Sequence, residues 1–224
     1  MILQNRHLEK ALNDLEAAYE SVPGDQHEYE DNAMALEIVE RALAQALRTT
    51  VDLLLLLDPT DIMELEAPLK AHVGRMMTVR ALLQYELGQQ DFAAHSARLA
   101  CQAFRDTLAY RFTDEGRYAA NHLHQLLTRD VAGIAIGPHE AADCYEELFD
   151  YYASRQIHDR AEDMLFFALE LTDHPVPLLE RGIAYYDSLQ SLETVELQRH
   201  GLPRHEVNES RRELEERLRR QRAD

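Results

Sequence analysis

The chain has 224 residues, of which 46% are hydrophobic and 29% are charged, with 8 Gly, 7 Pro and 2 Cys. This apolar content is too high for a disordered chain, and two cysteines are too few to hold a chain of this length together by disulfides. Its 41 acidic and 23 basic residues give a formal net charge of −18, which argues against nucleic acid and anionic membranes as partners. The composition predicts a globular protein with its own apolar core.

Three observations bear on where the protein works. The longest apolar run, Val51 to Leu57, contains Asp52 and is far shorter than the roughly 20 residues that cross a bilayer. The first ten residues lack the charged and then apolar pattern of an export signal. Cys101 and Cys144 lie in apolar stretches, as buried reduced thiols do. We therefore expect a cytoplasmic protein that does not span a membrane.

Apolar residues recur every three or four positions between Gly and Pro residues, which indicates an all-α protein. The pattern predicts a first helix over residues 4–19 and a polar linker to about residue 30. A long helix follows and stops at Asp58, before Pro59, because proline disfavours helical geometry in the residue before it. Leucines lie all round the last turns of this helix, over residues 53–57, and they predict that its end is buried.

Capping residues then mark three more helices in the first half. Thr60 or Asp61 is expected to cap a short helix, and Pro68 to begin a longer one that Gly88 ends. Asp91 is expected to cap a helix that runs to about residue 112, and residues 113–116 lead into a helix through Leu127.

The second half begins after a segment rich in Gly and β-branched residues, 131–137, which predicts a loop. Residues 130–138 are a candidate boundary between two helical subdomains within a single domain spanning 1–224. The remaining predicted helices cover residues 139–154, 158–171, 177–191 and 205–222, with a short ambiguous piece at 193–198. We expect about nine to ten helices in all, arranged as antiparallel hairpins.

The last predicted helix has a thin apolar stripe of Val207, Leu214 and Leu218. We therefore expect it to lie at the periphery or to pack against a second copy of the chain. In three places along this helix an acidic residue stands four positions before a basic one, a spacing that predicts ion pairs within the helix. These pairs are Glu213 with Arg217, Glu215 with Arg219, and Glu216 with Arg220.

Two places in the chain join a pair of predicted helices in the same way. Residues 85–92, which contain Gly88, form the first connection, and residues 151–156, which end at Gln156, form the second. Each connection is followed by two alanines seven positions apart. These are Ala93 and Ala100 after the first, and Ala161 and Ala168 after the second.

Both places resemble the tetratricopeptide repeat, in which a Gly at the turn and small residues on the second helix let two helices cross closely. Gly88 and Gln156 lie 68 positions apart, twice the repeat length of about 34 residues. The unit between them departs from the pattern, because Leu127 and Ile134 would occupy its small positions, and Gln156 stands where Gly is preferred. The resemblance covers residues 76–108 and 139–175. It implies a right-handed superhelix whose groove binds proteins.

Motifs that carry catalysis are absent from the sequence. It contains no G-x-x-x-x-G-K-[ST], no G-x-G-x-x-G, no G-x-S-x-G and no H-E-x-x-H, and no histidine follows an acid by three residues as a di-iron bundle requires. His122 and His124 lie about 200° apart around a helix and do not share a face. We therefore expect no catalytic residue, no cofactor and no metal.

Other acid and histidine groups have simpler interpretations. His139 with Asp143, and His158 with Glu162, are spaced as hydrogen-bonded pairs on a helix surface. A run of acids after the leucines is typical of a helix start, where the helix dipole favours negative charge. It comprises Asp58, Asp61, Glu64 and Glu66.

One polar group suggests recognition of a partner. Three residues share a predicted helical face, and further Arg and Tyr residues follow soon after. Guanidinium groups bind carboxylates and phosphates with two hydrogen bonds, so these residues are candidates for binding a carboxylate or phosphate of a partner. The alternative is that the arginines pair with the surplus acidic residues of the chain itself. The candidate partner-binding residues are Arg98, Gln102, Arg105, Tyr110, Arg117 and Tyr118, with Arg111 beside them.

Taken together, the sequence predicts a non-catalytic scaffold of helical hairpins that binds a protein or peptide. A structural homo-oligomer that uses the last helix or the 131–136 segment is one alternative. A helical protein or enzyme that binds a small ligand without a recognisable motif is another.

Overall fold

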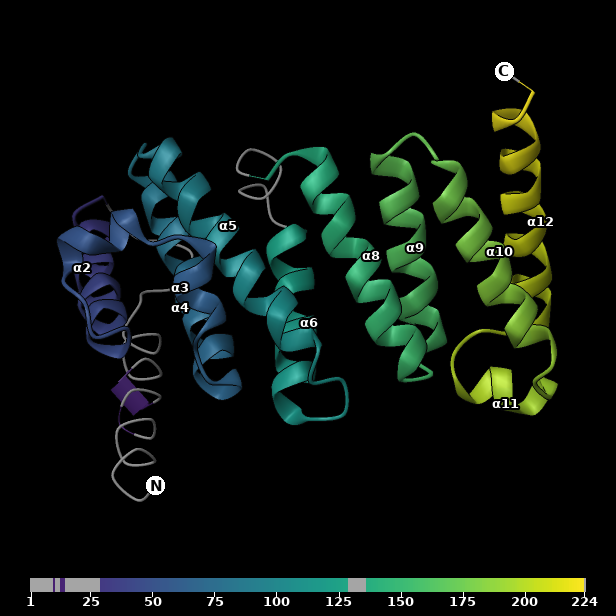
Figure 1. Ribbon diagram of the computed structural model, residues 1–224, viewed down its shortest axis with the longest axis horizontal. Helices are drawn as coiled ribbons and strands as arrows, with labels where there is room; N and C mark the ends of the chain where they lie inside the picture. The colour runs from purple at the N-terminus through teal and green to yellow at the C-terminus, as the bar shows by residue number, and fades with distance from the viewer. Residues whose placement is uncertain (1–9, 11–12, 15–28, 129–135, 224) are drawn as a thin grey trace. The chain divides into compact units, whose positions relative to one another are not determined.

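The computed structural model in Figure 1 describes residues 10, 13–14, 29–128 and 136–223. All regular structure in these residues is helical, which confirms the predicted all-α class. The chain divides into two compact units, residues 1–137 (unit 1) and 138–224 (unit 2). The helix predicted over residues 4–19 and the loop predicted over residues 131–137 lie largely outside the described residues.

The described residues contain eleven helices, slightly more than the nine to ten expected. Those of unit 1 are α2 (Tyr29–Ala46), the 3₁₀-helix η1 (Val51–Leu56), α3 (Pro59–Met63), α4 (Ala67–Glu86), α5 (Gln90–Leu108) and α6 (Asp114–Leu127). Those of unit 2 are α8 (Pro138–Ser154), α9 (His158–Leu171), α10 (Val176–Gln190), α11 (Thr194–Arg199) and α12 (Arg204–Gln221). In unit 1, α4 packs against α2, α5 and α6; in unit 2, α8 packs on α9 and α10 on α12.

The expected long helix up to residue 57 is wrong, because α2 ends at Ala46. Arg48 has a left-handed backbone (φ 54°), and the N–H of Thr49 donates to the carbonyl of Ala44 at 2.9 Å, which closes the helix end. The following leucines form η1, a separate 3₁₀-helix. Splitting the expected helix in two accounts for part of the higher helix count.

The predicted burial of residues 53–57 is also wrong. Leu54 is fully buried and Leu57 half-buried, whereas Leu53, Leu55 and Leu56 are exposed. A 3₁₀-helix has three residues per turn, so Leu54 and Leu57 share its inner face and the other leucines fall on its two outer faces.

The helix starts in unit 1 differ in detail from the expected ones. Asp58, rather than Thr60 or Asp61, caps α3: it accepts from the Thr60 N–H at 2.7 Å, and its own N–H donates to Asp61 at 2.9 Å. The N-cap of α5 is Gln89 rather than Asp91. α4 starts one residue before Pro68, α5 ends at Leu108 rather than near 112, and the short piece at 193–198 is the helix α11.

The two connections singled out in the sequence are equivalent turns. Gly88 (φ 74°) and Gln156 (φ 58°) both adopt the left-handed conformation. In each turn the next N–H donates to the carbonyl five positions back, from Gln89 at 2.8 Å and from Ile157 at 3.0 Å. The alanines that follow are buried, so each second helix crosses its partner closely. They are Ala93, Ala100, Ala161 and Ala168.

The last helix, α12, packs on α10 within unit 2, rather than standing apart from it. Val207 and Leu214 are buried, and a Cβ atom placed on Gly182 of α10 would lie 2.6 Å from Leu214 Cδ1. The glycine therefore lets α12 approach closely, so a narrow apolar stripe is enough. Of the three expected ion pairs on α12, two are present, Glu213 with Arg217 and Glu215 with Arg219.

Candidate functional site

The polar residues predicted on one face of α5 do not form a single open cluster. Arg98 is exposed, whereas Gln102 and Arg105 are half-buried. Gln102 Nε2 donates to Asp106 Oδ1 at 2.7 Å, and the second oxygen of Asp106 lies 3.5 Å from Nζ of the buried Lys70. Gln102 is therefore part of a contact between α4 and α5.

Tyr118, the last of the predicted partner-binding residues, is packed between α4 and α6. Its ring stacks on His72 with centroids 5.1 Å apart, and its hydroxyl accepts from Arg75 Nη1 at 3.1 Å. His122 lies against the same ring at 4.2 Å and also stacks on Phe104. These contacts hold helices together and leave the Tyr118 ring covered on two sides.

Tyr110 and Arg117 lie at the connection between α5 and α6. Tyr110 is exposed, and the exposed Arg117 forms an ion pair with Asp114 at 2.8 Å. The six predicted residues are thus spread over α5, the following connection and α6, with Gln102 and Tyr118 engaged in helix packing. Their binding of a partner stays a prediction.

A buried polar network in unit 1 was not predicted from the sequence. Arg80 is 1% exposed; its Nε donates to Glu40 Oε1 at 2.9 Å and its Nη1 to Ser96 Oγ at 3.2 Å. Ser96 in turn donates to Gln84 Oε1 at 2.8 Å. The network joins α2, α4 and α5, and all its members come from packed helices, so it serves the core.

Unit 2 has a polar cluster on α9, α10 and α12. The expected surface pair of His158 and Glu162 is wrong, because each side chain bonds to α10 instead. His158 Nδ1 is hydrogen-bonded to the Tyr185 hydroxyl at 2.9 Å. Glu162 Oε1 accepts from Tyr186 and from Ser210, both at 2.6 Å. The helix spacing that suggested the pair is real, but neighbouring helices supply better partners for both groups.

Burial shifts the pKa values of this cluster in opposite directions. It raises the pKa of the Glu162 carboxyl, although the hydrogen bonds from Ser210 and Tyr186 partly oppose it. It lowers the pKa of His158, and the nearby His200 ring acts in the same sense. His158 is 4% exposed, and its Nε2 atom has no hydrogen-bond partner in the described residues. His158 is therefore buried, whereas Glu162, Tyr185 and Ser210 are half-buried.

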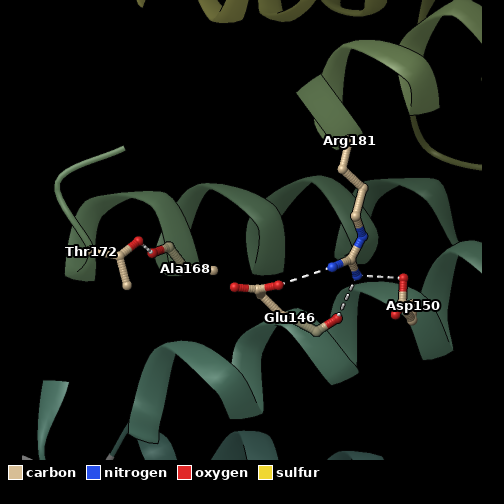
Figure 2. Close-up of polar contacts among 5 residues, drawn as sticks. All are labelled: Glu146, Asp150, Ala168, Thr172 and Arg181. Carbon is tan, nitrogen blue, oxygen red and sulfur yellow. Dashed lines mark hydrogen bonds and ion pairs between the residues drawn. The ribbon is translucent and has the colours of Figure 1, made fainter. Parts of the chain in front are cut away.

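Arg181 joins α10 to α8, as Figure 2 shows. Its guanidinium donates to Glu146 Oε2 at 2.9 Å and to the Glu146 carbonyl at 3.2 Å, and pairs with Asp150 at 2.5 Å. It also lies over the Phe149 ring, 5.0 Å from the centroid. Nη1 and Nη2 both bond to residues of α8, so this arginine links the two helices.

A shallow cleft of about 420 Å³ lies beside the second half of α12. Arg217 pairs there with Glu213, contacts His174 and lies over the Phe166 ring at 5.4 Å. Its positive charge is thus already matched. The cleft is lined by His174, Glu213, Glu216, Arg217, Arg220 and Gln221.

Several exposed apolar side chains in the described part of unit 1 lie in the segment from Asp52 to Glu66, here called the η1–α3 segment. Its apolar side chains are well exposed: Leu53 48%, Leu56 74% and Met63 52%, with Leu55 beside them at 42%. The buried Leu54 and Ile62 hold the two short helices onto the unit. Large exposed apolar side chains gathered in one segment are typical of a surface that contacts another molecule.

Comparison with protein-family models places the chain in a family. Residues 62–219 match the model of a family of unknown function, DUF6483. The chain belongs to this family. No curated protein and no solved structure matches the chain. The matched DUF6483 model is not a tetratricopeptide-repeat model, so that resemblance rests on the two hairpins themselves.

The DUF6483 match spans most of both units but begins at Ile62, within α3. The exposed leucines of η1 therefore precede the matched region, while Met63, Glu64 and Glu66 lie inside it.

Metal-binding clusters and membrane-spanning helices are both absent from the described part of the chain. No three His, Cys, Asp or Glu side chains there are grouped so that they could hold a metal ion. No helix among those residues has the length and apolar character needed to cross a membrane.

Proposed function

We propose that this member of the DUF6483 family is a non-catalytic scaffold that binds another protein in the cytoplasm. The observation that carries the proposal is the η1–α3 segment, in which four large apolar side chains are exposed: Leu53, Leu55, Leu56 and Met63. Burying a large apolar side chain contributes about 1.5–3 kcal/mol, so such a surface gains stability when a partner covers it.

The two equivalent hairpins support the scaffold reading. Left-handed residues at Gly88 and Gln156, followed by buried alanines, give α4/α5 and α8/α9 the close crossing that tetratricopeptide hairpins use. We include in the proposal that the hairpins are degenerate units of this kind. Helical hairpins in this role present surfaces to proteins rather than reactive groups.

The polar groups of the described residues favour binding over catalysis. Arg80, Glu162 and Arg181 each meet partners on neighbouring helices, which explains their positions without a substrate. Cys101 and Cys144 are buried and are not joined in a disulfide, as expected for a protein of a reducing compartment.

A homo-oligomer built on the last helix is less well supported. α12 places Val207 and Leu214 in the core of its own unit and has a half-buried Leu218. This leaves a mostly charged outer face, which is unlike the apolar centre of a stable dimer interface.

The proposal is tested by affinity purification of the full chain from its own cells, with mass spectrometry of whatever is bound in stoichiometric amount. Leu53→Ser, Leu56→Ser and Met63→Ser are combined in one variant. The control combines Met34→Ser, Leu171→Ser and Val195→Ser, which are also exposed but lie elsewhere. We expect a protein partner that is lost from the first variant and retained by the control.

Circular dichroism first establishes that both variants are folded. Recovery of the partner with both variants would move the binding site away from η1–α3. Recovery of no protein with the unmodified chain would contradict the scaffold function itself.

A further inference from the structure

The apolar side chains of the η1–α3 segment are set among acids. Residues 49–69 contain five carboxylates and no Lys, Arg or His. All five are exposed, and they lie within a few positions of the exposed Leu53, Leu56 and Met63 along the chain. The acids are Asp52, Asp58, Asp61, Glu64 and Glu66.

The range is flanked by the exposed Arg48 and by Lys70, so one exposed cation stands against five carboxylates. Lys70 is buried, donates from Nζ to the Met63 carbonyl at 2.8 Å and pairs with Asp106. Two of the acids, Asp58 and Asp61, are held in place by the capping box of α3. Hydrogen bonds from Thr60 lower the pKa of the Asp58 carboxyl, so that it stays ionised well into the acidic range.

We propose that the η1–α3 segment docks a basic amphipathic segment of another protein, one that places leucine-like side chains beside Lys or Arg. This inference rests on the proposed function and names the chemistry of the partner. The exposed leucines supply the apolar contact, and the five carboxylates select a cationic partner and exclude acidic ones.

Charge also argues against two other occupants. A second copy of this chain carries the same net charge of −18, so two acidic η1–α3 segments repel each other when they meet face to face. An anionic membrane is repelled by the same carboxylates. A cationic helix is attracted by the carboxylates both while it approaches the segment and once it is bound.

The test measures binding of three fluorescent peptides to the full chain by anisotropy. Each forms an amphipathic helix of about five turns, roughly 18 residues, with the same leucine face. The polar face carries Lys in the first peptide, Gln in the second and Glu in the third. We expect the Lys peptide to bind at least tenfold more tightly than the Gln peptide, and the Glu peptide not to bind.

Two variants separate the charge from the apolar contact. Asp52→Asn, Glu64→Gln and Glu66→Gln together remove three charges but keep the α3 capping box. We expect this change to weaken the Lys peptide about tenfold, since exposed charge pairs contribute modestly each. The control, Glu86→Gln with Glu170→Gln and Glu209→Gln, removes the same charge elsewhere and should change binding less than twofold.

The second variant is the leucine-to-serine combination used above, which should weaken the Lys peptide by at least tenfold while the serine control does not. Equal binding of the Lys and Gln peptides would overturn the inference. If the natural partner is nevertheless lost with the leucines, the scaffold function stands and its partner is not basic. A dimer that the leucine changes dissociate in sedimentation would assign the surface to a second copy and likewise overturn the inference.

Discussion

The α4/α5 hairpin of unit 1 and the α8/α9 hairpin of unit 2 have the same turn, and their residues correspond at an offset of 68 positions. Their cores are nevertheless built differently. Arg80 in the first corresponds to Leu148 in the second, and both are almost completely buried. Likewise Ser96 corresponds to Met164. One crossing geometry thus accepts either a hydrogen-bonded polar core or an apolar one.

The difference follows from what each hairpin packs against. In unit 1, α2 brings Glu40 to Arg80, so that the buried guanidinium has a carboxylate partner. In unit 2 the equivalent position is filled by Leu148, which needs no partner. The local sequence pattern of each hairpin therefore determines how its two helices cross, whereas a third helix determines which residues can be buried at the crossing.

The largest effect is expected from removing the polar core of the first hairpin. Arg80→Ala leaves Glu40 without its partner and opens a cavity, which should lower the free energy of unfolding of unit 1 by about 3–5 kcal/mol. Urea unfolding measures the loss. Arg41→Ala, which removes an exposed pair with Glu37, is the control and should cost less than about 1 kcal/mol. A loss of the same small size for both would mean that the buried network contributes no more than a surface pair.

A smaller effect is expected where the second hairpin has a Cβ atom and the first has none. Gly74 corresponds to Ala142, but a Cβ on Gly74 would lie 2.9 Å from Cε1 of Phe104. The position equivalent to Phe104 holds the smaller Thr172, whose hydroxyl donates to the Ala168 carbonyl at 2.7 Å (Figure 2). Gly74→Ala should therefore destabilise unit 1 by about 1 kcal/mol, since overpacking outweighs the gain in helix propensity. Thermal unfolding decides the sign, and a more stable variant would contradict the tight fit.

Opposite substitutions in the two turns, at Gly88 and Gln156, should change the free energy of unfolding by a similar or smaller amount and in opposite directions. A Cβ on Gly88 would meet no atom within 4 Å, so Gly88→Ala probes backbone conformation alone and should cost about 1 kcal/mol. Gln156→Gly removes the same left-handed strain and should stabilise unit 2 by about 0.5 kcal/mol, because added freedom in the unfolded chain offsets part of the gain. Thermal unfolding of both variants measures the pair. Shifts of the same sign would show that the two turns are not equivalent.

The smallest effect concerns pH and belongs to the second hairpin. His158 has a pKa below its ordinary value of 6.5, whereas the equivalent Gln90 does not titrate. Between the folded and unfolded pKa values the unfolded chain binds more protons, so the contribution of His158 is full above about pH 6.5 and is lost as the pH falls below it. Hydrogen exchange in α9 and α10 should show this loss.

His158→Gln should reduce the pH dependence of unit 2 in that range. Glu162, whose pKa is raised, acts in the opposite sense: its contribution falls as the pH rises above its ordinary value of 4.5. Comparing the variant with the unmodified protein isolates the histidine. An unchanged pH profile would show that His158 does not titrate during unfolding.

Much of the helical pattern was predictable because it depends on neighbouring residues. Gly88 ended a helix as expected, Thr113 caps α6, and α9 begins and ends where the periodicity placed it. The leucines of η1 were misjudged, since an α-helical period was assumed for a 3₁₀-helix. Arg48, whose left-handed backbone separates α2 from η1, has no sequence signal comparable to that of a glycine.

The candidate site was less predictable than the fold. Arg and Tyr residues drew attention on α5 and α6, yet Tyr118 and Gln102 are used in packing. The sequence pattern of the acids from Asp58 to Glu66 predicts only a helix start. Their position beside exposed leucines emerged only once burial was known.

The sequence by itself determined the all-α class, most helix ends and the two matching turns, because these depend on residues within a few positions of one another. The tertiary structure alone decided which polar side chains are buried. Arg80 meets Glu40, and Glu162 meets Tyr186 and Ser210, across 24 to 48 positions of sequence. Burial of a charged or polar group requires a partner, and that partner is supplied by whichever helix packs beside it.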